Sequence, residues 1–319
     1  MVPSRRAALA AVVVVVAGVG LGTGCKAKPP AAPVLEPRTP EEAEREIAAL
    51  LDEAYQSLKR NNAPGMMSLI AADAFLAGPR FGDVAVERSE ALVAVGEAVR
   101  GKKAPRLRSS KLQVGGAPEG RSAWAVDQLE LNGKPLVVVA LGAEVDGMWA
   151  LTAIQVARLT RDAEAPAASA ASAWAPANGG AHRPAPPEVA TVVAQLTGEP
   201  ERRLDYLDHY ADRESMVVRS GPKSAVRGVK DIKKAWKKQA PVWTLGEALA
   251  SATTPDGAFA WALLPAALDG EPAGTRRVFI VLERFVPEVE GDAEAAAAAP
   301  DAPLLPWRLV VLHESAPSP

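Results

Sequence analysis

Cysteine is nearly absent from this 319-residue sequence, which contains a single one, at position 25. One cysteine excludes an intramolecular disulfide framework and a cysteine-rich zinc site. The three histidines are widely separated, so we expect no metal centre. Lysine and arginine number 36 against 38 aspartate and glutamate residues, and this balance argues against nucleic acid as a partner. The sequence also lacks the motifs of nucleotide, serine-hydrolase and zinc-protease sites, so no cofactor is expected.

The N-terminus has the layout of an export signal. Arg5 and Arg6 precede an apolar run over 7–20 that is too short to span a ~30 Å hydrocarbon core comfortably. Small residues then lead to Cys25, as in a bacterial lipoprotein signal, where the thiol is lipidated. We therefore expect a signal peptide over 1–24 and a protein that is exported and lipid-anchored through Cys25. The outer membrane, facing the periplasm or the cell surface, is the expected place. The alternative is ordinary cleavage near Cys25 or an uncleaved anchor.

Segments of biased composition divide the rest of the chain. Residues 25–38 are rich in proline and predict an extended tether near the lipid. Residues 161–187 consist mostly of alanine, proline, serine and glycine, which predicts an interdomain linker. Residues 287–306 carry five acidic residues and an alanine run, which predicts a disordered insertion. Two blocks remain as predicted domains, 39–160 and 188–315.

Each block begins with helix signals and ends with strand signals. In the first block, Thr39 and Glu42 form a capping box ahead of apolar residues at helical spacing. The helices predicted there are 40–61, 66–72 and 90–100, the last capped by Ser89. Turn residues separate the strands predicted after them, which are 111–114, 122–131, 135–145 and 149–159.

The second block repeats this order. Its predicted helices are 188–196, 199–210 and 229–239, and its predicted strands are 244–253, 258–268, 275–285 and 307–313. Similar residues recur at a spacing near 140 positions, as between Ala72 and Ala211, and the same order matches 122–125 with 257–260 and Trp149 with Trp307. The order predicts two tandem α+β domains, each with N-terminal helices packed on a curved antiparallel sheet.

Three stretches of the second block resemble the nuclear transport factor 2-like superfamily, which includes the ketosteroid isomerases and the SnoaL-like polyketide cyclases. They are VRGVKDI (226–232), TPDGAFAW (254–261) and WRLVVLHES (307–315). The resemblance implies two cone-like domains, each with a pocket between helices and sheet, and pairing across the open sheet faces. We expect the two blocks to pair with each other within the chain. The first block departs from the pattern, since Ala157 takes the place of the final histidine.

Candidates for chemistry cluster in the second block. Enzymes that resemble ketosteroid isomerase need an aspartate base and tyrosine or aspartic acid donors in an apolar pocket. Asp212 or His209 is the candidate base, and Tyr210 is the candidate donor to an oxyanion. The alternative interpretation is a polar helix whose tyrosine rings pack while its charged groups lie in water.

The last strand contributes a further candidate. Strand alternation predicts that His313 lies on the same face as Trp307, Leu309 and Val311, as a catalytic or ligand-contacting group or as a structural histidine. Four tryptophans are predicted to line pocket mouths or to fill cores, namely Trp124, Trp149, Trp261 and Trp307.

Taken together, these features predict a membrane-tethered envelope lipoprotein that is not an enzyme. Its domains would bind an apolar small molecule or an envelope protein. The alternative is a cofactor-free isomerase or cyclase in the second block, which requires Tyr210, Asp212 and His313 to converge within hydrogen-bonding reach. A third interpretation, a structural spacer, predicts no pocket larger than ~300 Å³.

Overall fold

The computed structural model of the chain describes residues 38–79, 84–85, 88–90, 104–158, 185–219, 225–239, 241–285 and 305–316. We call 38–158 the first half and 185–316 the second half. The predictions for the signal peptide, Cys25, the tether, the linker, the acidic insertion and the helix capped by Ser89 fall almost entirely outside the described residues. Among the residues described, no helix combines the length and the apolar character that crossing a membrane requires.

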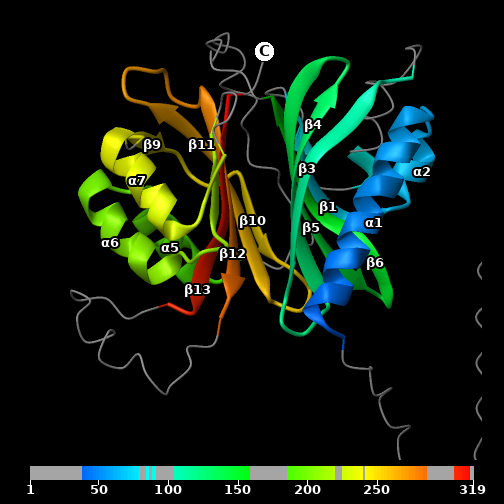
Figure 1. The fold of residues 1–319 in the computed structure, drawn as a ribbon, viewed down its shortest axis with the longest axis horizontal. Coiled ribbons are helices and arrows are strands. Elements are labelled where there is room, and N and C mark those ends of the chain that lie inside the picture. Colours follow the sequence, from blue (N-terminus) through cyan, green and yellow to red (C-terminus); the bar gives the residue numbers. More distant parts are fainter. Residues whose placement is uncertain are drawn as a thin grey trace, which may run out of the picture. The chain divides into compact units, whose positions relative to one another are not determined.

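The first half packs helices on one mixed sheet. Helices α1 (Pro40–Lys59) and α2 (Ala63–Met67) precede six strands in the order β2-β1-β6-β5-β4-β3. The strands are β1 (Ile70–Ala77), β2 (Val84–Ala85), β3 (Leu107–Gly116), β4 (Ser122–Leu131), β5 (Lys134–Val145) and β6 (Met148–Arg158). Figure 1 shows α1 lying along one face of this sheet.

Local chemistry explains where α1 begins and what it covers. The Glu42 amide donates to Thr39 Oγ1 at 3.3 Å, and the Thr39 amide donates to Glu42 Oε2 at 2.9 Å, so the predicted capping box is present. Ile47 and Leu51 recur one turn apart and are buried against the sheet. The helix therefore has one apolar face, and that face forms the core of the first half.

The second half repeats the plan with three helices. Helices α5 (Pro187–Thr197), α6 (Pro200–Tyr210) and α7 (Val229–Gln239) lie near the predicted positions and are grouped on one side of the second sheet (Figure 1). The strand order is β10-β11-β12-β13-β7-β8, and β9 pairs with β11. The strands are β7 (Met216–Val218), β8 (Ala225–Arg227), β9 (Trp243–Leu245), β10 (Ala250–Thr253), β11 (Phe259–Leu268), β12 (Arg276–Arg284) and β13 (Trp307–Ser315).

The α+β class with helices ahead of each sheet is confirmed, but the sheets are not wholly antiparallel. β1 runs parallel to β6, and β7 runs parallel to β13. The helix predicted over 66–72 is wrong beyond Met67, because α2 ends there and Ile70 already pairs with Leu151. A β-strand at this point depends on contact with the last strand of the same sheet, about 80 residues later, which local periodicity does not report.

One extra residue interrupts the last strand of each sheet. In β6 the register passes from Leu151 to Ala153, which leaves Thr152 unpaired with β5. In β13 it passes from Leu309 to Val311, which leaves Val310 unpaired with β12. Since side chains alternate between faces along a strand, such a bulge moves every following side chain to the opposite face.

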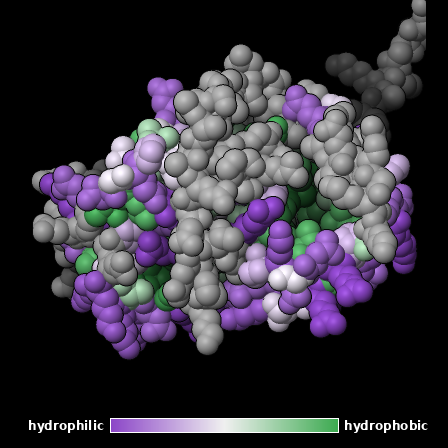
Figure 2. Space-filling view, turned by 90° about the horizontal axis from the view of Figure 1, so that it is seen from above, coloured by the Kyte–Doolittle hydropathy of each residue, from purple (hydrophilic) through white to green (hydrophobic). Residues whose placement is uncertain are grey.

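Each sheet has one face covered by helices and a second apolar face. The helix-covered faces form two separate cores, one in each half, which we call the helix-side cores. A third cluster, which we call the inter-sheet core, takes residues from both sheets, and in it the rings of Phe75 and Trp261 stack with centroids 4.6 Å apart. In the view from above, hydrophilic residues dominate the outer margins of the described surface, and apolar residues show mainly in its recesses (Figure 2).

Candidate functional site

His313 lies on the face of β13 that contributes to the inter-sheet core. Its Nδ1 lies 2.8 Å from Gln155 Oε1 on β6, and Gln155 Nε2 donates to Ser315 Oγ at 3.2 Å. Gln155 Oε1 is thus the acceptor, and His313 donates from Nδ1. Both residues are buried, and burial lowers the pKa of His313 to about 3. The imidazole is therefore neutral at physiological pH and ties the two sheets together.

Of the three predicted neighbours of His313, only Val311 shares its face. Trp307 and Leu309 belong to the helix-side core of the second half, whereas Val311 belongs to the inter-sheet core. The prediction that His313 shares a face with Trp307 and Leu309 is wrong, because the bulge at Val310 reverses the alternation between them.

The counterpart of His313 in the first half is Gln155, not Ala157. Trp149 and Trp307 are 158 residues apart, as are Gln155 and His313, and each of the latter two pairs with the parallel strand of its own sheet. The strand registers likewise place Trp124 opposite Leu141 and Trp261 opposite Val281, one strand from the bulged strand. Trp124 therefore corresponds to Trp261, and not to Phe259 as the match of 122–125 with 257–260 predicted.

Tyr210 and Asp212 do not meet His313. Tyr210 is buried in the helix-side core of the second half, where burial raises the pKa of its hydroxyl. Asp212 follows α6, and its Oδ1 accepts hydrogen bonds from the amides of Glu214 and Ser215. The second sheet separates Tyr210 from the inter-sheet face that holds His313. The hydrogen bonds of Asp212 go to Glu214, Ser215 and Arg308, so the three groups do not converge as an isomerase of this kind requires.

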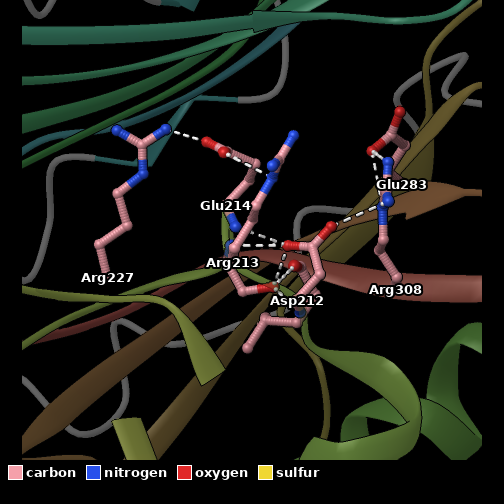
Figure 3. A network of polar contacts seen from close by, with 8 residues as sticks. Asp212, Arg213, Glu214, Arg227, Glu283 and Arg308 are labelled. Carbon is pink, nitrogen blue, oxygen red and sulfur yellow. Dashed lines mark hydrogen bonds and ion pairs between the residues drawn. The ribbon is translucent and has the colours of Figure 1, made fainter. Parts of the chain in front are cut away.

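Asp212 is instead part of an ion-pair network (Figure 3). Arg308 Nη1 donates to Asp212 Oδ2 at 2.9 Å, and Arg308 Nη2 donates to Glu283 at 2.6 Å. Burial raises the pKa of Glu283 and the Asp212 charge adds to this effect, while Arg308 opposes it. Glu214 pairs with Arg227 in the same view. Asp212 is thus held in place by an arginine and two backbone amides, which is a structural role.

The four candidate tryptophans divide between the two kinds of core. Trp124 and Trp261 lie in the inter-sheet core, so they do not face the space between helices and sheet. Trp307 lies in the helix-side core of the second half, and Trp149 packs against that of the first half. The Trp149 indole nitrogen is buried and makes no hydrogen bond to a described residue.

A polar cluster inside the helix-side core of the first half was missed by the sequence analysis. Asp127 on β4 is fully buried, and its Oδ1 accepts a hydrogen bond from Ser109 Oγ at 2.9 Å. The facing strand β3 is bulged between Ser109 and Lys111. Tyr55 reaches this point from α1. Its hydroxyl and Asp127 Oδ2 are both buried, and neither makes a hydrogen bond of ordinary geometry with a described residue.

Burial governs the proton affinities of this pair. It raises the pKa of Tyr55, and the nearby Asp127 carboxylate adds to that rise. It also raises the pKa of Asp127, while the hydrogen bond from Ser109, the nearby Tyr55 hydroxyl and the Lys111 amide act against the rise. A buried carboxyl with a raised pKa can accept or return a proton, and a neutral tyrosine can donate a hydrogen bond to a developing oxyanion.

A sequence signal for this site exists in the alternation of β4. Ala125 and Leu129 are inward-facing residues of the first core, and Asp127 lies between them at the same period of two. An acidic residue at a core position of a strand is rare unless it is paired or functional. Its partner Tyr55 is 72 positions earlier in the chain, so no local motif connects the two residues.

The corresponding core of the second half contains charged groups with ample partners. Arg203 on α6 is fully buried between the rings of Trp236 and Trp243, with its Cζ 5.2 and 4.7 Å from the two ring centroids. It donates to three carbonyl oxygens, those of Thr197, Gly198 and Pro241. Trp243 Nε1 donates in turn to the buried Glu314 at 3.0 Å. This cluster closes the end of α5, and the Nε atom of Arg203 is buried within it without a hydrogen bond to a described residue.

Metal chemistry finds no support in the part of the chain that the structure describes, where no three histidine, cysteine, aspartate or glutamate residues are grouped to hold an ion. Neither a family model nor a curated protein matches the chain.

Comparison with solved structures found small proteins that each match little more than a third of this chain. An NTF2-like protein of unknown function from Pseudomonas putida is 15% identical, with a TM-score of 0.34, over 37% of this chain and 88% of its own. A protein of unknown function with a cystatin-like fold from Nostoc punctiforme is 17% identical, with a TM-score of 0.33, over 38% and 94%. An uncharacterized cystatin-like protein from Caulobacter vibrioides is 16% identical, with a TM-score of 0.35, over 38% and 93%.

Proposed function

We propose that this chain is an exported envelope lipoprotein with two NTF2-like, SnoaL-like domains that serves as a non-catalytic binding or scaffold module. The observation that carries the proposal is the placement of His313, whose hydrogen bond to Gln155 occupies it within the inter-sheet core. Tyr210 lies on the other side of the second sheet, and Asp212 is bound to Arg308. Among the described residues of the second half, the three candidates His313, Tyr210 and Asp212 therefore do not support a catalytic role.

Export and anchoring follow in this proposal from the N-terminal sequence. Lipidation of Cys25 would hold the two halves at the membrane through the proline-rich tether. Replacement of Cys25 with serine removes the thiol that carries the lipid, so Cys25→Ser should move the protein from the detergent phase to the aqueous phase. A Cys25→Ser protein that stays with the membrane contradicts lipidation.

The binding role is tested on the protein in its own envelope. Native mass spectrometry of the detergent-extracted protein should show a co-purifying protein or a small apolar molecule. Only the bare chain, at every extraction condition tried, would favour the spacer interpretation instead. Chemical crosslinking before extraction provides the parallel test for weakly held envelope proteins.

The Tyr55–Asp127 pair favours a second candidate function, a cofactor-free isomerase located in the first half. Two of its buried oxygen atoms, neither hydrogen-bonded to a described residue, supply a carboxylate and a hydroxyl within the helix-side core, as proton transfer next to a carbonyl requires. The test is conversion of a β,γ-unsaturated ketone to its conjugated isomer, followed by ultraviolet absorbance. Asp127→Asn should lower the rate by about 10²-fold or more. Absence of turnover by the wild-type chain overturns this candidate and leaves the binding proposal intact.

A further inference from the structure

A cleft of about 470 Å³ lies where β3 begins and β4 ends in the first half. Its size falls within the ~300–1,000 Å³ typical of small-molecule sites. The lining residues are Arg106, Arg108, Glu130, Asn132 and Gly133. Leu107 is buried in the helix-side core, and the Ser109 hydroxyl bonds Asp127 on the same face. Arg106 and Arg108, which alternate with them, therefore point to the other face of the sheet. The cleft is thus separate from the Tyr55–Asp127 pair.

The backbone around the cleft is fixed by a tight turn. Asn132 and Gly133 have φ angles of 52° and 79°, the left-handed values that a two-residue hairpin turn of this kind requires. The Asn132 amide donates to the Arg106 carbonyl at 2.8 Å, and the Arg106 amide donates to Asn132 Oδ1 at 2.9 Å. These two bonds hold Arg106 against the turn and leave the Asn132 side-chain NH₂ as a donor.

The cleft contains more positive than negative side chains. Arg106 and Arg108 are two residues apart on one face, a separation of roughly 7 Å along a strand. Glu130 is the register partner of Arg108, and its Oε1 lies about 4.0 Å from where a Gly133 β-carbon would be. Neither guanidinium makes an ion pair or a side-chain hydrogen bond with a described residue. Two cations and one carboxylate give the cleft a net charge of about +1.

We propose that this cleft binds a small organic anion, bearing a carboxylate or phosphate group with a hydroxyl group next to it. The guanidinium groups of Arg106 and Arg108 present paired donors that match either oxyanion, and the Asn132 amide adds a third donor. Glu130 accepts the hydrogen bond of the adjacent hydroxyl. This ligand class is polar and differs from the apolar molecule of the proposed function, so the two proposals stand or fall separately.

A matched series of three probes tests the cleft in the full chain. Glycerol 3-phosphate and glycerate carry the two oxyanions on the same hydroxylated skeleton, and glycerol carries neither. Isothermal titration at low salt should show binding of at least one anion and none of glycerol. The affinity should fall as salt rises, because exposed arginines are screened. The anion that binds more tightly shows whether the cleft prefers a phosphate or a carboxylate.

Two variants locate the site. Arg106→Gln and Arg108→Gln should each weaken anion binding about tenfold or more, since a hydrogen bond to a charged group contributes roughly 1.5–3 kcal/mol. Because the Arg106 backbone, not its side chain, holds the turn, both variants should keep the wild-type unfolding midpoint. Arg45→Gln, on the exposed face of α1, is the matched control and should bind as the wild type does. No binding of either anion by the wild type at millimolar concentration, or equal binding by all variants, overturns the proposal.

Discussion

Arg203 shows at the scale of one residue how a buried charge is held without a carboxylate. Its guanidinium donates to three carbonyl oxygens and stacks between two indole rings. Two of those carbonyls, of Thr197 and Gly198, are at the C-terminal end of α5, where helix carbonyls lack partners within the helix. Burial lowers the pKa of Arg203 to about 10, which still leaves it charged at neutral pH.

Replacement of Arg203 with methionine should destabilise the protein by about 3 kcal/mol or more. Three buried carbonyls would lose their donor, and each unsatisfied group costs roughly 1–3 kcal/mol. The measurement is urea unfolding followed by tryptophan fluorescence. Arg202→Met is the control, since its side chain is exposed one position earlier on α6 and should change stability by less than about 0.5 kcal/mol. Equal effects of the two substitutions would show that burial of Arg203 contributes nothing.

His313 makes stability depend on pH. Its pKa is about 3 in the folded chain against an ordinary value of 6.5, so the unfolded chain binds more protons between these two values. The stability contributed by the neutral imidazole is therefore complete above pH 6.5 and is lost as the pH falls toward 3. In that window its contribution to the slope approaches ~1.4 kcal/mol per pH unit.

His313→Gln should accordingly flatten the loss of stability between pH 6.5 and pH 4, measured as the free energy of unfolding at four or more pH values. Ser315→Ala removes a partner of Gln155 but keeps the imidazole, so it should keep the wild-type slope at a lower overall stability. A wild-type slope in His313→Gln would falsify the assignment of this dependence to His313.

At the scale of the element, sequence periodicity succeeds where contacts are local. The capping box and the spacing of Ile47 and Leu51 set α1, and the turn at Asn132 sets the β4–β5 hairpin. Sequence periodicity fails to predict β1 and β7, because each pairs in parallel with a strand far along the chain. It also fails beyond Thr152 and Val310, because one extra residue reverses a period of two without changing composition. Alternation alone therefore could not predict which faces hold Gln155 and His313, or that these two residues meet.

The start of α1 offers a direct test of local control. Thr39→Ala removes the side-chain oxygen that accepts from the Glu42 amide, and should lower the free energy of unfolding by about 1 kcal/mol. Thr39→Ser keeps an oxygen at the same place and should restore most of that loss. Chemical unfolding monitored by circular dichroism checks both variants. If serine proves no better than alanine, the capping box does not stabilise this helix.

At the scale of the whole molecule, the second apolar face of each sheet determines whether one half can fold without the other. Met216, Phe259 and Phe279 would be exposed on the second sheet without its partner, as would Phe75 and Val139 on the first. Exposure of so large an apolar surface opposes independent folding of either half. Only the family resemblance predicted that the two sheets would pack against each other, because the residue pattern within one strand does not indicate what covers its second face.

The contact between Phe75 and Trp261 measures this coupling, since the two rings come from different sheets and stack at 4.6 Å. A double-mutant cycle of Phe75→Leu and Trp261→Leu should give an interaction energy of about 0.5–1.5 kcal/mol in a single unfolding transition. A cycle of Phe75→Leu with Trp236→Leu, which lies in the helix-side core of the second half, should be additive within about 0.5 kcal/mol. If the first cycle were also additive, the stacked rings would not couple the sheets. Two separate transitions in the wild type would mean that each half folds alone, so that the inter-sheet core joins two domains without making them one cooperative unit.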